Sequence, residues 1–191
     1  MLKPFFQGKL DTFCAIYAVL NALRLTHGLR VMKAREILND TLLGLASSPE
    51  AFRAVLNQET DYIALVDGML NVQSRVFPLE VSKPFININM PLPDPGRLWQ
   101  TFLDWMSPGG GRTIIFRFLR SLSPESGPVH RHWTTVGSMS EHTIRLFDCS
   151  HEAEAILNIA RDSIVTLPED ISQDRLLLIQ PESVRMLRLP V

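Results

Sequence analysis

Cysteine and excess charge are both scarce in this sequence. Its 191 residues include only two cysteines, Cys14 and Cys149, which are too few for a framework of disulfide bonds. The 19 lysines and arginines nearly balance the 20 aspartates and glutamates, so the net charge is −1. Proteins that bind nucleic acid usually carry a basic face, and we therefore expect no nucleic-acid partner.

Long hydrophobic runs are missing as well. No apolar run that resembles a secretory signal precedes Gln7, and the apolar stretch that follows is broken by Asn21 and Arg24. We therefore expect a cytoplasmic protein with no membrane partner. Because 46% of the residues are hydrophobic and no long linker interrupts them, residues 1–191 are predicted to form one domain.

The most informative stretch is an apolar helix predicted from Thr12 onward and ended by Thr26-His27-Gly28. Its large apolar residues recur at the spacing of one helix face, and they are Phe13, Ile16, Val19, Leu20 and Leu23. Cys14 is expected two or three residues into this helix, behind a loop with Asp11 and Thr12 as possible caps. Free N–H groups at a helix N-terminus favour a thiolate and can also hold an oxyanion. An inert buried cysteine is the competing interpretation.

A glutamine precedes this cysteine by seven positions. The side-chain amide of Gln7 could donate a hydrogen bond to a tetrahedral oxyanion, beside the backbone N–H of Cys14. An exposed loop glutamine without a catalytic role is the alternative.

A histidine and an aspartate are predicted to meet far along the chain. Residues 132–137 and 143–148 are rich in β-branched and aromatic residues and predict two strands joined by a short polar turn. His132 is expected to open the first strand and Asp148 to close the second, so an antiparallel hairpin would place them at the same end. His132 could then take the thiol proton of Cys14, while Asp148 orients the imidazole ring.

This order of residues resembles the papain-like cysteine peptidases. The similarity is closest to compact members of that group, such as Josephin-type deubiquitinases and bacterial peptidase C39-like proteins. The motifs that carry it are Gln7…Cys14-Ala15…Asn21-Ala22-Leu23 and His132-Trp133-Thr134-Thr135-Val136…Phe147-Asp148. The resemblance covers residues 5–27 and 130–151, and the stretch between these segments matches no family that we can name.

The sequence also departs from that group. The residues around Cys14 differ from the Cys-Gly-Ser-Cys-Trp motif of papain, and the loop from Gln7 to Cys14 is slightly longer than usual. Asp148 stands where papain and Josephin domains carry Asn. The resemblance nevertheless implies a papain-like α+β fold, with catalytic roles for Cys14, His132, Asp148 and Gln7.

The rest of the chain predicts helices first and strands later, which is typical of the α+β class. Helices are expected over residues 31–46, 49–57, 61–72 and 97–106. An edge strand or irregular crossover is expected within 74–95, and a short helix or irregular segment over 151–162. Further strands, over residues 112–119, 164–167, 175–180 and 184–189, complete a mostly antiparallel sheet. We expect the helical lobe to bring the nucleophile and the sheet to bring the base.

No cofactor and no metal site are expected. His130 and His132 lie two residues apart, but no second pair of ligands is placed to complete a zinc site. The glycines of Pro108-Gly109-Gly110-Gly111 are not a phosphate loop, because neither a helix nor a Lys-Ser/Thr pair follows. A disulfide between Cys14 and Cys149 stays an open alternative, although a reducing cytosol would disfavour it.

The predicted function is that of a cysteine peptidase or related thiol hydrolase with a peptide or protein substrate. The enzyme would cleave a peptide or isopeptide bond through a thioester with Cys14. Two alternatives fit the same sequence. One is a binding or regulatory protein on the same fold without turnover, and the other is a delivered effector or toxin domain with transferase or deamidase chemistry.

Overall fold

The computed structural model describes residues 2–7, 13–57, 59–86, 91–126, 128–150 and 156–190. The helices are α1 (Cys14–His27), α2 (Val31–Ala46), α3 (Pro49–Leu56), α4 (Tyr62–Gln73) and α5 (Pro95–Met106). The strands are β1 (Glu80–Ser82), β2 (Arg112–Ser121), β3 (Pro128–Met139), β4 (Thr143–Leu146), β5 (Asn158–Ala160), β6 (Ile164–Val165) and β7 (Leu177–Arg188). The predicted α+β class is confirmed.

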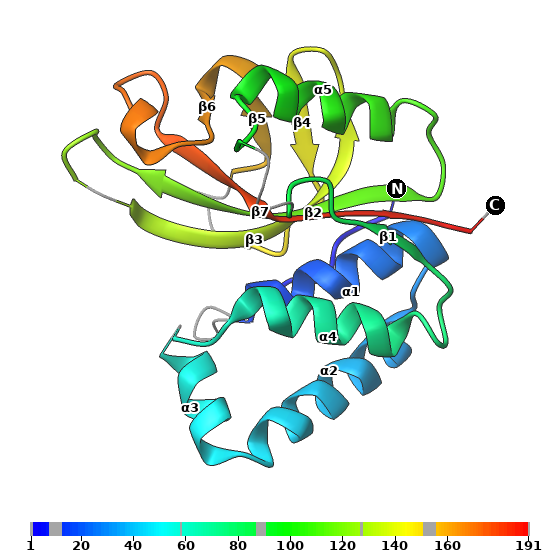
Figure 1. The fold of residues 1–191 in the computed structure, drawn as a ribbon. Helices are drawn as coiled ribbons and strands as arrows, with labels where there is room; N and C mark the ends of the chain where they lie inside the picture. The colour runs from blue at the N-terminus through cyan, green and yellow to red at the C-terminus, as the bar shows by residue number, and fades with distance from the viewer. Residues whose placement is uncertain are drawn as a thin grey trace.

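One sheet separates two layers of helices. Its strands follow the order β1-β7-β2-β3-β4-β5, and all of these neighbours are antiparallel, while β6 pairs with β7 in parallel. Helices α1 to α4 lie on one side of the sheet and α5 lies on the other (Figure 1). Each side has its own hydrophobic core, one around α1 and one between α5 and the sheet.

Helix α1 fills the core below the sheet. From Ala15 to Leu23 every residue except Tyr17 is at most 1% exposed, which explains why this helix is apolar almost all round. Thr135 on β3 donates its hydroxyl to the Ala18 carbonyl at 2.9 Å and so fixes the helix against the strand. The helix ends at Gly28, whose φ of 65° is the left-handed conformation that glycine adopts at little cost.

Local signals located the other helices closely. Ser48, Asp61 and Asp94 cap α3, α4 and α5, each accepting a hydrogen bond from the backbone N–H three residues later. Helix α5 begins at Pro95, two residues before the predicted start, because the cap stands at Asp94. The predicted edge strand is β1, at the end of the sheet.

The bounds around the predicted site residues were partly wrong. Helix α1 begins at Cys14 itself, after Phe13, and the suggested caps Asp11 and Thr12 lie outside the described residues. His132 is the fifth residue of β3 and Asp148 lies two residues beyond β4. The reason is that β2 and β3 continue to pair up to Ser121 and Pro128, so the predicted loop between them is shorter.

Two other segments also differ from the prediction. Residues 158–160 form β5 on the sheet edge, whereas residues 151–155 of the same predicted segment lie outside the described residues. The two strands predicted over 175–180 and 184–189 are one strand, β7. It continues past Pro181 because the Ser183 hydroxyl accepts the backbone N–H of Arg117 at 2.8 Å, where the pairing of β2 and β7 shifts register.

An ion pair between a buried arginine and a partly exposed aspartate joins the sheet to the helical layer. Arg185 on β7 is fully buried and donates from Nε and Nη2 to the two carboxylate oxygens of Asp67 on α4, at 2.6 and 3.0 Å. Lys83 reaches the same carboxylate at 2.7 Å. Burial alone would raise the pKa of Asp67, but the hydrogen bonds from Arg185 and Lys83 outweigh it and lower the pKa.

Candidate active site

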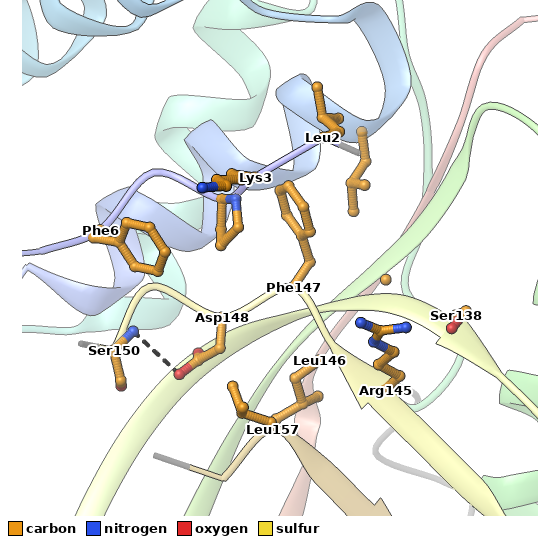
Figure 2. A pocket seen from close by; sticks show the side chains of 13 residues that line it. Leu2, Lys3, Phe6, Ser138, Arg145, Leu146, Phe147, Asp148, Ser150 and Leu157 are labelled. Carbon is orange, nitrogen blue, oxygen red and sulfur yellow. Dashed lines mark hydrogen bonds between the residues drawn. The ribbon is translucent and has the colours of Figure 1, made fainter. Parts of the chain in front are cut away.

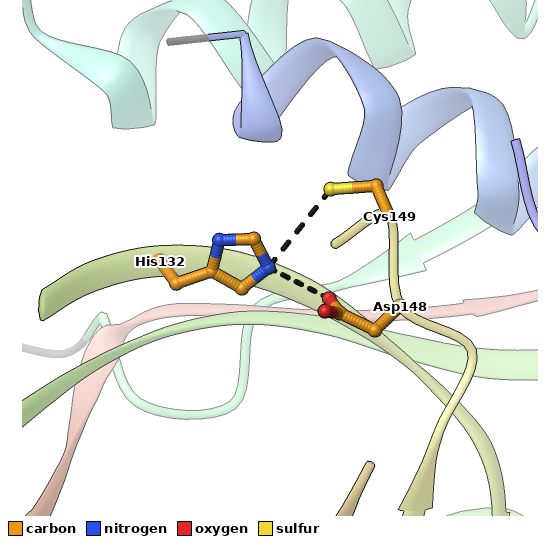
Figure 3. Close-up of side chains that lie close together, drawn as sticks. All are labelled: His132, Asp148 and Cys149. Carbon is orange, nitrogen blue, oxygen red and sulfur yellow. Dashed lines mark hydrogen bonds and ion pairs between the residues drawn. The ribbon is translucent and has the colours of Figure 1, made fainter. Parts of the chain in front are cut away.

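His132 and Asp148 form a buried pair at one end of the sheet. The Nε2 atom of His132 lies 2.7 Å from Oδ1 of Asp148, and their side chains are only 3% and 2% exposed. Figure 3 shows the carboxylate and the imidazole facing each other, with the ring above β3. The sequence therefore predicted this contact correctly, although His132 lies within β3 and Asp148 lies beyond the end of β4.

The Asp148 carboxylate is held by further donors. The Thr134 hydroxyl donates to Oδ1 at 2.7 Å, and the backbone N–H of Ser150 donates to Oδ2 at 3.2 Å. Thr134 lies two residues after His132 on the same strand, so β3 positions both the His132 ring and the hydroxyl that holds Asp148. Sequence reasoning missed Thr134, although its spacing from His132 was a usable signal.

The electrostatics of the pair favour the charged forms. Burial alone would lower the pKa of His132, but hydrogen bonds to Asp148, Cys14 and Cys149 outweigh it, and the pKa lies well above its ordinary value. Burial alone would raise the pKa of Asp148, yet hydrogen bonding and charge from His132 hold it below its ordinary value. The contact therefore favours the ion pair of an imidazolium and a carboxylate.

Cys14 meets this ion pair from the first position of α1. It is half-buried and contributes a hydrogen bond to His132 that raises the pKa of the ring. Cys14 and His132, 118 positions apart in the sequence, are therefore near enough in the fold for Cys14 to affect the pKa of the ring.

Cys149 is the second thiol at this site. Its Sγ lies 3.9 Å from His132 Nε2, and Figure 3 shows it reaching the same ring nitrogen as Asp148. The residue is 1% exposed, and burial raises the pKa of its thiol to about 11. Cys149 therefore stays protonated at neutral pH and is a poor nucleophile. Both Cys14 and Cys149 are free thiols in this structure, so the disulfide considered from the sequence is not formed.

Gln7 is attached to Cys149 by two hydrogen bonds. The backbone N–H of Gln7 donates to the Cys149 carbonyl at 3.0 Å, and the Cys149 thiol donates to Oε1 of Gln7 at 3.5 Å. Because the amide oxygen accepts from the thiol, the Nε2 group of Gln7 is the end that can serve as a donor elsewhere. The segment before Gln7 is held by Asn21 of α1, which bonds both the N–H and the carbonyl of Phe5.

Aromatic rings hold the imidazole from its faces. His130 stacks on His132 with ring centroids 5.3 Å apart, and Phe118 of β2 contacts the His132 ring edge-on at 5.6 Å. His130 was the competing candidate for the base from the sequence. In the structure it supports the His132 ring, while His132 makes the contact with Asp148.

An open cavity of about 620 Å³ borders the site at Asp148. Asp148 and Ser150 contribute to its wall, and Figure 2 shows Phe6 and Leu157 on either side of them. Most of the other lining residues are apolar, and Lys3 and Arg145 are the two cations among them. The remaining lining residues are Leu2, Pro4, Leu25, Gly137, Ser138, Leu146 and Phe147. The cavity therefore offers an apolar surface next to the predicted catalytic group.

Within the described residues, one group could hold a metal ion. His132, Asp148 and Cys149 each place one donor atom within 4.8 Å of the others. This set could not be predicted from the sequence, because only Asp148 and Cys149 are neighbours in the chain.

Comparison with known proteins adds no family. No protein-family model matches the sequence, and no curated protein matches it. Among the described residues, no helix combines the length and the hydrophobicity needed to cross a membrane. The functional interpretation therefore rests on the residues of the site and their geometry.

Proposed function

We propose that this protein is a cysteine hydrolase with a papain-like arrangement, in which Cys14 is the nucleophile, His132 the base and Asp148 the orienting group. The observation that carries the proposal is the buried contact of His132 and Asp148, 2.7 Å apart, with Cys14 at the start of α1 and among the groups that raise the pKa of the same ring. A raised pKa keeps His132 protonated, and a positive ring beside the thiol favours the thiolate.

The reaction follows from these positions. The Cys14 sulfur attacks the carbonyl carbon of a peptide or isopeptide bond, and the developing oxyanion accepts hydrogen bonds from the Cys14 backbone N–H and the Gln7 side-chain amide. His132 donates its proton to the leaving amine, which leaves a thioester on Cys14. His132 then takes a proton from water, whose attack releases the acid and restores the thiol.

The supporting side chains have separate tasks in this proposal. Asp148 keeps the imidazole in one orientation and stabilises its positive form, as Thr134 keeps the carboxylate in place. Cys149 holds the oxygen of the Gln7 amide and so leaves its N–H group for the oxyanion. The apolar cavity beside Asp148 would receive part of the peptide or protein substrate. A free nucleophilic thiol persists in a reducing compartment, so we keep the cytoplasm as the proposed location.

Alkylation of the thiol with iodoacetamide across pH tests the proposal. Intact-mass analysis would compare wild type with Cys14→Ala, His132→Ala and Cys149→Ala, and His142→Ala serves as an exposed histidine control. We expect fast labelling of Cys14 near neutral pH, which slows in His132→Ala but not in His142→Ala. Ordinary reactivity of Cys14 that does not respond to His132 would refute the enzyme and favour a binding protein.

A further inference from the structure

Three side chains that carry nitrogen, oxygen and sulfur donors converge beside α1. They are His132, Asp148 and Cys149, whose donor atoms all lie within 4.8 Å of one another (Figure 3). Imidazole, carboxylate and thiolate are the three side-chain ligands that Zn²⁺ takes in proteins. We propose that His132, Asp148 and Cys149 bind one Zn²⁺ ion and that the bound ion blocks the thiol chemistry of Cys14.

The distances suit a tetrahedral ion after a small adjustment. Zinc bonds of about 2.0–2.3 Å at tetrahedral angles place neighbouring ligand atoms about 3.3–3.7 Å apart. The distance from His132 Nε2 to Cys149 Sγ is 3.9 Å, close to that value. The distance from Nε2 to Asp148 Oδ1 is 2.7 Å and must widen, which a modest rotation of the carboxylate achieves.

The surroundings supply a fourth position and a path for the ion. The Ser150 hydroxyl lies 3.4 Å from His132 Nε2, so it or a water molecule would complete the coordination. The cavity of about 620 Å³ reaches Asp148 and Ser150 from solvent. Lys3 and Arg145 in its wall oppose the approach of a cation, but both are exposed, so solvent and salt screen their charges.

The charge of the buried group does not change when the ion binds. Zinc coordinates a thiolate and a neutral imidazole, so its entry releases the thiol proton of Cys149 and the Nε2 proton that faces Asp148. Two protons leave as one dication arrives. A net charge is therefore not added to the protein interior, where it would be costly.

The consequence for Cys14 rests on the proposed function, whereas the zinc site itself does not. With Zn²⁺ on Nε2, the His132 ring is neutral and its remaining proton lies on Nδ1. Such a ring neither accepts the thiol proton nor stabilises a thiolate by its charge. A chelator that removes the ion would restore both properties.

Metal titration of the full chain, with both cysteines reduced, tests the site. Zn²⁺ affinity is measured by competition with a chromophoric chelator, and Co²⁺ serves as a spectroscopic probe for thiolate ligation and tetrahedral geometry. We expect one ion per chain and a sulfur-to-cobalt charge-transfer band in wild type. Cys149→Ala should lose this band and weaken Zn²⁺ binding by more than the roughly 10- to 100-fold that loss of a ligand's hydrogen-bonding partner costs. Cys14→Ala and His142→Ala should bind as wild type does.

The outcomes separate the two proposals. Zn²⁺ affinity that is equal in wild type and Cys149→Ala would overturn the site, and so would a loss of binding in Cys14→Ala as large as in Cys149→Ala. Iodoacetamide labelling of Cys14 that continues at the same rate with Zn²⁺ bound would overturn the blocking effect. Zinc binding by a protein whose Cys14 shows only ordinary reactivity would support the site and refute the hydrolase.

Discussion

Replacement of Asp148 by asparagine probes the ion pair on which the site depends. The substitution preserves the shape of the side chain and removes its charge, next to a His132 ring that is 3% exposed. Its amide also presents N–H donors where the carboxylate accepts from His132, Thr134 and Ser150. Breaking a buried pair by removing one partner typically costs about 3–5 kcal/mol, and we expect a loss of that size in the free energy of unfolding near pH 6.

The loss should depend on pH in a definite direction. The raised pKa of His132 gives stability that is complete below its ordinary value of about 6.5 and disappears as the pH rises through the folded-state pKa. The lowered pKa of Asp148 gives stability above its ordinary value of about 3.9 that disappears as the pH falls through the folded-state value. The difference between wild type and Asp148→Asn is therefore largest between about pH 4 and 6.5.

Urea denaturation at several pH values measures this difference. Above the folded-state pKa of His132 the ring is neutral in both proteins, so only unsatisfied hydrogen bonds remain, at about 1–3 kcal/mol. Glu141→Gln removes an exposed carboxylate from the turn after β3 and should change stability little at any pH. A constant loss from pH 5 to 10 in Asp148→Asn would refute the ion pair.

Three further changes test the surroundings. Thr134→Val removes the hydroxyl that donates to the charged Asp148, so it should lower the free energy of unfolding in urea by about 1.5–3 kcal/mol and slow the alkylation of Cys14. Thr134→Ser keeps the hydroxyl and should keep both the stability and the alkylation rate of wild type. Gln7→Ala should reduce turnover of a peptide substrate about 10²- to 10³-fold but leave the alkylation rate unchanged, since alkylation forms no oxyanion; equal loss in both assays would contradict this role. Asp67→Asn should lower the free energy of unfolding in urea by about 1.5–3 kcal/mol, because buried Arg185 loses the charged partner of its hydrogen bonds, and a loss below about 1 kcal/mol would contradict a structural ion pair.

Local features of the sequence predicted the helices well. The helices predicted over residues 31–46, 49–57 and 61–72 agree with α2, α3 and α4 to within one residue at each end, because helix signals act within a few turns of the chain. The joining of two predicted strands into β7 could not be read locally. It depends on Ser183 accepting a hydrogen bond from Arg117, which lies 66 positions earlier.

The site divides in the same way. The types and order of Cys14, His132 and Asp148 in the sequence predict that these side chains lie together in the fold, because a nucleophile requires a base and an orienting group. Cys149 carried no such signal. Its contact with Gln7 spans 142 positions, and a buried thiol looks the same in the sequence whether it packs against carbon atoms or against a side-chain amide.

The strand order has a consequence for the newly made chain. β7 lies between β1 and β2 in the interior of the sheet, yet among the strands of the described residues it comes last in the chain. Until residues 177–188 are present, β2 has an unpaired edge. The sheet that carries His132 on β3 is then incomplete. We therefore expect the proposed site to form, and Cys14 to become reactive, only after residues 177–188 are available to pair with β2.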